Sequence, residues 1–233
     1  MTPIRDPRPA AHVGVVTGLL SEAGCLPLSG PKIYVSAGVA VNAHGGAIRL
    51  ISDGAAALIS FGIAGGLDPK LKPGTLVLAR AVTAPEGARY ECDEGWRKQV
   101  AAEARGDIAL ADGIIAGRDA PVLGVEEKAQ LYIETGAAAA DMESHAVAAA
   151  AAEAKIPFLA VRAIADPARR RVPAFALTGV DARGRIRAMP VLMQALIRPW
   201  EWTALIALAR DHAAAMAALR RAGRLRSLFV LPR

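Results

Sequence analysis

Cysteine is scarce in this sequence, which has 233 residues and only two cysteines, Cys25 and Cys92. Neither has the spacing to another cysteine or to a histidine that zinc sites and redox motifs use. We therefore expect two inert thiols in a reducing, cytoplasmic environment and no disulfide framework. The residues predict neither a metal site nor a cofactor.

Long apolar runs are also lacking, although 53% of the residues are hydrophobic. Without a run of about eighteen apolar residues, a membrane-spanning helix is not expected. The first dozen residues contain proline and arginine but no apolar core, so we expect no secretion signal there. A chain of this length can bury one large core, and the prediction is a single domain over residues 1–233.

Lysine is absent from residues 162–233, which carry 14 arginines and 4 acidic residues, a net charge of +10. Residues 1–161 carry 14 basic and 18 acidic residues, a net charge of −4. This asymmetry predicts an anionic partner for the C-terminal third. Aromatic residues make up only 4% of the chain and no nucleic-acid motif is present, so nucleic acid is not expected. The anionic face of a membrane is the favoured partner, and a solvated arginine-rich surface is the alternative.

Apolar segments typical of strands alternate with segments typical of helices. Near-continuous apolar runs at 57–61, 76–82 and 158–164 predict strands that are covered on both faces. Further strands are predicted at 13–16, 32–35 and 108–116 and just before Glu143, and helices at 19–25, 41–52, 96–105, 125–135 and 146–154. The alternation predicts an α/β fold, a three-layer α/β/α sandwich with a central mixed, largely parallel sheet.

After Pro167 the sequence becomes basic and helical, and we expect residues 168–233 to pack on the sandwich as a C-terminal extension. A short helix is predicted at 189–197 and a longer one from Pro199. Apolar residues of the longer helix recur at helical spacing, namely Trp202, Leu205, Ile206, Ala209, Ala213 and Met216. Packing of this stripe on the sheet is the first interpretation, and contact with lipid or with a second copy is the alternative.

Three motifs lie near the ends of predicted strands, where ligands collect in α/β proteins. The run Phe61-Gly62-Ile63-Ala64-Gly65-Gly66-Leu67-Asp68-Pro69 follows one strand, and it does not match the dinucleotide-binding glycine pattern. In Ala140-Asp141-Met142-Glu143-Ser144-His145-Ala146, Glu143 lies where a strand meets a helix, and the helix dipole favours its ionised form. The run Val161-Arg162-Ala163-Ile164-Ala165-Asp166-Pro167 ends a third strand on Asp166.

In order and spacing, these motifs resemble those of the purine nucleoside phosphorylase and methylthioadenosine/S-adenosylhomocysteine nucleosidase superfamily, over about residues 12–166. The resemblance implies cleavage of a purine N-glycosidic bond. It assigns to Asp166 the proton donation to the leaving purine, to Glu143 the two ribose hydroxyls, and to Met142 packing against the ribose.

The same resemblance places the glycines Gly65 and Gly66 against the substrate and Val122 near the purine. It leaves the nucleophile open. Glu22 aligns with the water-activating glutamate of the hydrolytic branch, and the alternative is a solvated helix residue with phosphate as co-substrate. Ile63 stands where the family usually has a serine, so its side chain offers no hydroxyl to phosphate or water.

A closer resemblance links residues 60–69, residues 141–148 and the helix that follows Arg198-Pro199 to the hopanoid-associated phosphorylases, which remove adenine from adenosylhopane. It implies a lipid-linked adenine nucleoside as substrate and peripheral contact with the inner face of the membrane. We also expect a homo-oligomer, a dimer. An apolar channel would be lined by Leu192, Met193, Leu196, Trp200 and Trp202, and membrane contact would involve Arg220, Arg221, Arg224 and Arg226. The alternatives are a methylthioadenosine-type nucleosidase, a general purine nucleoside phosphorylase, and a nucleoside-binding protein without turnover.

Overall fold

The computed structural model describes residues 11–231, and the expectation of no secretion signal falls mainly on residues outside this range. An eight-stranded mixed sheet forms the centre of the described part. Its strands are β1 (His12–Thr17), β2 (Lys32–Val35), β3 (Ala55–Gly66), β4 (Leu76–Thr83), β5 (Arg89–Glu91), β6 (Leu110–Gly117), β7 (Ala139–Asp141) and β8 (Phe158–Asp166). The helices are α1 (Leu20–Ala23), α2 (Ala40–Ser52), α3 (Glu94–Glu103), α4 (Val125–Thr135), α5 (Ser144–Ala154), α6 (Ala188–Leu196) and α7 (Trp202–Ala222), with 3-10 turns η1 (Ala174–Gly179), η2 (Pro199–Glu201) and η3 (Arg226–Phe229).

The strand order is β2-β1-β3-β7-β6-β4-β5, and β8 pairs with both β3 and β4. Most pairs are parallel, whereas β7 runs antiparallel to β3, and β4 runs antiparallel to β5 and β8. The predicted mixed, largely parallel sheet is therefore confirmed. The path from β3 through β7, β6, β4 and β8 returns to β3, so part of the sheet closes on itself. This closure joins strands that are distant in sequence, and the strand patterns did not predict it.

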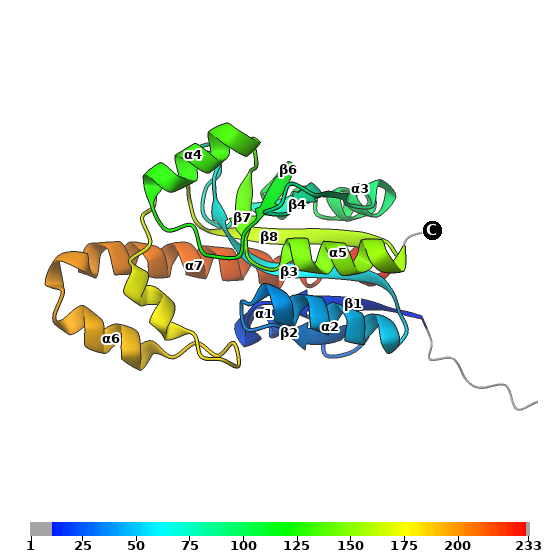
Figure 1. Cartoon of the computed structure of the whole chain (residues 1–233), viewed down its shortest axis with the longest axis horizontal. Helices are drawn as coiled ribbons and strands as arrows, with labels where there is room; N and C mark the ends of the chain where they lie inside the picture. The colour runs from blue at the N-terminus through cyan, green and yellow to red at the C-terminus, as the bar shows by residue number, and fades with distance from the viewer. Residues whose placement is uncertain (1–10, 232–233) are drawn as a thin grey trace, which may run out of the picture.

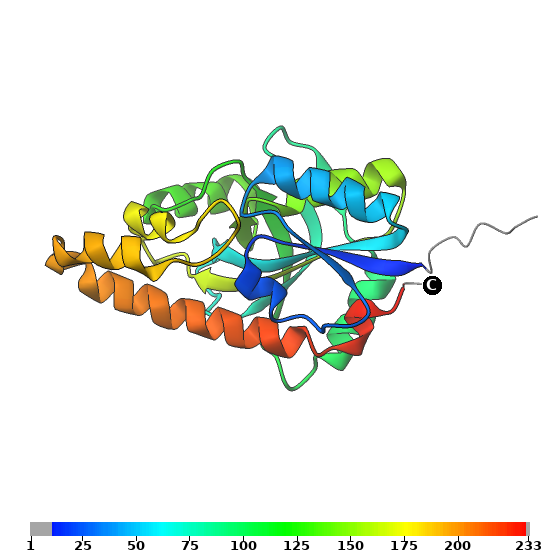
Figure 2. The same cartoon turned by 90° about the horizontal axis from the view of Figure 1, so that it is seen from below.

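Helices cover both sides of the sheet (Figures 1 and 2). Helices α2 and α5 lie together on one side, and α7 crosses the other side against β8. The alanine-rich α5 is buried on most of its surface, since small side chains let the helix approach both β3 and α2 closely. This packing holds the N-terminus of α5, with Glu143 as its N-cap residue, at the end of the sheet.

The glycine motif corrects one sequence expectation. It was expected to follow the strand, but β3 continues through Gly66. Gly65 and Gly66 pair with Ala140 and Ala139 of β7, and Gly65 also lies beside Asp166 of β8. The backbone remains extended because strands on both sides satisfy its hydrogen bonds. As a result, the glycine and aspartate motifs are neighbours in one sheet.

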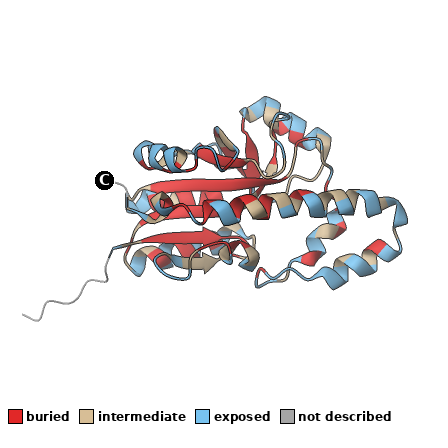
Figure 3. Cartoon of the chain, turned by 180° about the vertical axis from the view of Figure 1, so that it is seen from behind, coloured by how far each residue is buried: buried red, intermediate tan, exposed pale blue. Residues whose placement is uncertain are grey.

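The expectation that the apolar stripe of α7 packs on the sheet is wrong over most of its length. Met216 is buried, but Trp202, Ile206, Ala209 and Ala213 are exposed. The buried face of α7 is instead formed by Asp211, Ala215, Met216, Ala218, Leu219 and Ala222. The first half of α7 extends beyond the sheet together with α6, as Figures 1 and 3 show, so it has no sheet surface on which to bury that stripe.

Candidate active site

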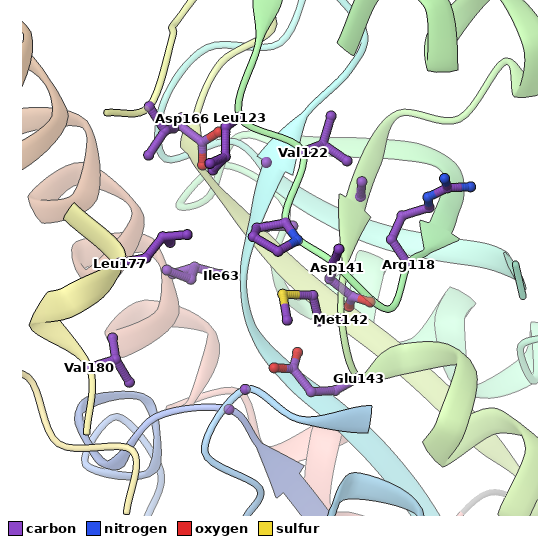
Figure 4. A pocket seen from close by; sticks show the side chains of 18 of the residues that line it. Ile63, Arg118, Val122, Leu123, Asp141, Met142, Glu143, Asp166, Leu177 and Val180 are labelled. Carbon is purple, nitrogen blue, oxygen red and sulfur yellow. The ribbon is translucent and has the colours of Figure 1, made fainter. Parts of the chain in front are cut away.

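A cavity of about 410 Å³ opens at the end of the sheet (Figure 4). This volume is within the range of small-molecule sites. Its walls come from the segment after β1, the end of β3, residues 118–123, residues 140–143 and the end of β8, and the segment after β8 contributes Val172, Leu177 and Val180. Segments far apart in the sequence therefore meet around one space.

Glu143 lies at one end of the cavity and is buried. Its Oε2 is 3.1 Å from Nη2 of Arg162, a fully buried arginine of β8. Burial raises the pKa of Glu143 to about 7, while Arg162 acts in the opposite direction. The carboxylate is thus kept in place by one cation and still faces the cavity, where it can accept hydrogen bonds from a ligand.

Arg162 has several further partners besides Glu143. Its Nε lies 2.5 Å from Oδ2 of Asp141 and 3.1 Å from Oγ of Ser144, and its Nη2 donates to Oγ of Ser60 at 2.6 Å. A buried guanidinium is stable only when its N–H groups are paired in this way. Arg162 therefore links β3, β7, β8 and the start of α5 beneath the cavity.

Glu22 is also buried and lines the cavity. Its Oε2 accepts hydrogen bonds from the backbone N–H groups of Gly18 and Leu19, at 2.9 and 2.8 Å, and its Oε1 accepts one from Ile63 at 2.9 Å. Burial raises the pKa of Glu22, whereas Arg162 and these N–H donors oppose the rise. The alternative of a solvated helix residue is therefore wrong.

Two glycines make room for this group of charged side chains. A Cβ on Gly18 would lie 2.8 Å from Oε1 of Glu143, and a Cβ on Gly62 would lie 2.6 Å from Nη1 of Arg162 and 2.8 Å from Oε1 of Glu22. Contacts this short would displace the side chains. The glycines therefore allow Glu22, Glu143 and Arg162 to converge.

Asp166 lies at the other end of the cavity from Glu143 (Figure 4). Its Oδ2 forms an ion pair with Nζ of Lys128, which is fully buried and also donates to the backbone carbonyls of Asp166, Pro167 and Arg170. Burial raises the pKa of Asp166 to about 6, and Lys128 limits the increase. A carboxyl with this pKa can donate a proton near neutral pH.

The structure brings most of the predicted site residues together. Met142 lies between Glu143 and Asp166 in the view of Figure 4, and Gly65 and Val122 also line the cavity. Gly66 does not, because a Cβ there would meet Ile164 and Pro167 rather than open space.

The expected channel residues lie elsewhere. Leu192, Met193, Leu196, Trp200 and Trp202 are exposed and do not line the cavity. They belong to the part of the chain that extends beyond the sheet, and the apolar wall of the cavity comes instead from Val172, Leu177 and Val180.

Sequence reasoning gave no role to Arg162 or Lys128. Arg162 had a signal, since it interrupts an apolar strand that is buried on both faces, where an unpaired charge is costly. Lys128 had none, because its position in α4 resembles that of any surface lysine. Among the described residues, no group of three or more histidine, cysteine and acidic side chains has the geometry of a metal site.

The fold is shared with solved structures of nucleoside-cleaving α/β enzymes. The structure is similar to that of the methylthioadenosine/S-adenosylhomocysteine nucleosidase of Neisseria meningitidis in complex with methylthio-immucillin-A, with 19% identity, a TM-score of 0.66 and coverage of 91% of this chain and 96% of the other. It is also similar to futalosine hydrolase of Helicobacter pylori, with 19% identity, a TM-score of 0.65 and coverage of 90% and 96%. A nucleosidase of Colwellia psychrerythraea in complex with adenine gives 17% identity, a TM-score of 0.67 and coverage of 94% and 97%.

The sequence matches the phosphorylase superfamily over residues 15–189, which is most of the chain. The protein is therefore an enzyme of the phosphorylase superfamily. No curated protein sequence gives a match to this chain.

Proposed function

We propose that this enzyme hydrolyses the N-glycosidic bond of an adenine nucleoside. The main support is the placement of three buried or partly buried carboxyl groups around one cavity: Asp166 at one end, and Glu143 with Glu22 toward the other. Asp166 would protonate the leaving base, Glu143 would accept hydrogen bonds from the ribose hydroxyls, and Glu22 would activate water. Met142 would pack against the sugar.

The charges near Glu22 favour water over phosphate as the nucleophile. Glu22, Glu143 and Asp141 surround Arg162, so three carboxylates share one guanidinium. A phosphate anion placed beside Glu22 would be repelled by the ionised members of this group. The Ile63 side chain supplies no hydroxyl, and its backbone N–H is already bonded to Glu22.

This choice of nucleophile can be tested with Glu22→Gln. The amide cannot deprotonate water, so we expect adenine release to fall about 10²–10⁴-fold. The parent enzyme should release adenine in phosphate-free buffer, and oxygen from labelled water should appear at the anomeric carbon of the sugar. Glu153→Gln, at an exposed position on α5, is the matched control. Product that forms only after phosphate is added, and that carries phosphate, would show that the enzyme is a phosphorylase.

The proposed role of Glu143 gives a second prediction. In Glu143→Gln, the neutral amide is a weaker acceptor from the ribose hydroxyls, so kcat/KM should fall by about 10- to 100-fold. The same substitution should have much less effect on a 2′,3′-dideoxy nucleoside, which lacks those hydroxyls. Equal loss on both substrates would mean that Glu143 acts only by supporting Arg162.

Adenosylhopane is the specific substrate that we propose. The wall formed by Val172, Leu177 and Val180 is apolar, and Leu177 and Val180 are also partly exposed, so the cavity opens along an apolar path. Such a path suits a nucleoside with a large hydrocarbon 5′ substituent. Adenine release should therefore be compared for adenosylhopane, methylthioadenosine and adenosine. A preference for methylthioadenosine would favour a nucleosidase of that type, and binding without release of base would indicate a nucleoside-binding protein.

A further inference from the structure

The helical hairpin made of α6, η2 and the first half of α7 has an apolar surface that no element within residues 11–231 covers. Met189, Leu192, Met193 and Leu196 occupy one face of α6 at the spacing i, i+3, i+4 and i+7, and all four are exposed. Trp200 continues this surface at the turn and is 72% exposed. We call Met189, Leu192, Met193, Leu196, Ile197 and Trp200 the hairpin surface. Exposed apolar surfaces of this kind mark interaction sites.

The other face of α6 shows that the hairpin is a folded element. Ala195 is buried, and Val191 packs against Gly179 of η1, where an added Cβ would lie 2.8 Å from the valine side chain. The indole N–H of Trp202 donates to the carbonyl of Ala195 at 2.7 Å and joins α6 to α7. The exposed face is therefore fixed in orientation by the packed one.

Exposed arginines lie next to the hairpin surface, at the start of α6. Residues 168–210 contain 8 arginines, no lysine and 2 acidic residues. Arg183, Arg185 and Arg187 are exposed in the loop that leads into α6. Gly184 of this loop accepts a hydrogen bond from the backbone of Leu20, close to the cavity wall. The positive charge is thus next to both the hairpin surface and the cavity.

We propose that the hairpin surface docks on an anionic lipid bilayer. Apolar side chains would enter the interfacial region, with Trp200 at headgroup depth, and the arginines would contact lipid phosphates. A second copy of the chain is a poorer occupant, because a twofold interface places the same patch on itself and would bring the arginine clusters together. No helix of the described residues is long and apolar enough to cross a bilayer.

Docking in this way would turn the cavity toward the lipid. Leu177 and Val180 line the cavity and precede α6, so an apolar group could pass from the bilayer along them. The delivery of a nucleoside with a hydrocarbon substituent rests on the proposed function. Binding of the hairpin surface to the bilayer is independent of that function.

The arginines at the other end of α7 are not part of this surface. Arg220 lies eighteen residues after Trp202 in α7, which is about 27 Å along the helix. Arg220, Arg221 and Arg224 are exposed beside the C-terminal end of that helix. The sequence-based expectation that they contact the membrane is replaced by a contact through Arg183, Arg185 and Arg187.

Co-sedimentation of the full chain with vesicles tests the proposal. We expect binding to phosphatidylcholine vesicles that contain phosphatidylglycerol, with release at high salt. The triple variant Arg183→Gln/Arg185→Gln/Arg187→Gln should bind about 100-fold more weakly. The matched variant Arg220→Gln/Arg221→Gln/Arg224→Gln removes the same charge from the far end of α7 and should bind like the parent. Equal weakening by both variants would overturn the proposal.

The apolar contribution is tested by Leu192→Ser/Leu196→Ser/Trp200→Ser. This variant should lose vesicle binding but keep the parent rate of adenine release from soluble adenosine. Sedimentation velocity of parent and variant gives the oligomeric state. If the parent fails to bind vesicles and the variant dissociates a dimer, the hairpin surface is an interface between copies. Vesicle binding without adenine release would contradict only the proposed function.

Discussion

Replacing Asp166 with asparagine should lower adenine release by about 10²–10⁴-fold, since an amide cannot protonate the leaving purine. Asp166 is suited to this task because burial raises its pKa to about 6 and because it faces the cavity. Its protonated form is present below that pKa and is lost as the pH rises through it. The basic limb of the kcat/KM profile of the parent enzyme is therefore expected near pH 6.

The measurement is adenine release in the steady state across the pH range, together with thermal unfolding of the variant. Asp112→Asn is the matched control, since Asp112 is exposed and does not line the cavity. Turnover of the Asp166→Asn enzyme above half of the parent value would remove Asp166 from the reaction.

Lys128→Met should shift the same pH profile in a defined direction. The ammonium group of Lys128 opposes the increase in the Asp166 pKa that burial causes. Without it, the pKa should rise by about 1–3 units, and the basic limb of kcat/KM should move to higher pH by the same amount. The maximal rate should fall, because Lys128 also holds the backbone carbonyls around Asp166.

Lys128→Arg is the conservative variant for this experiment, since it keeps the positive charge. Its basic limb should remain close to that of the parent, even if its maximal rate is lower. The assays are run below the unfolding temperature of each variant. A limb that stays in place in Lys128→Met would assign to Lys128 a purely structural role.

Much of the fold was predictable because strand and helix patterns are local properties of a sequence. The apolar runs that became β4 and β8 and the alanine-rich segment of α5 were assigned correctly. The same patterns placed Glu143 and Asp166 near strand ends, and the structure brings both to one cavity. The apolar pattern did not predict that the glycine motif belongs to β3. The motif is part of the strand because β7 and β8 pair with it on both sides.

The order of the main strands and helices, the charge asymmetry of the chain and the carboxyl groups at strand ends could all be predicted before any tertiary contact was known. These follow from side-chain periodicity and composition. Packing of distant segments was needed to show that Lys128 pairs with Asp166, that Arg162 pairs with Asp141 and Glu143 close to Glu22, and that the stripe beginning at Trp202 is exposed. Each of these depends on which distant segments pack together, and a helix with two apolar faces does not specify which face meets the sheet.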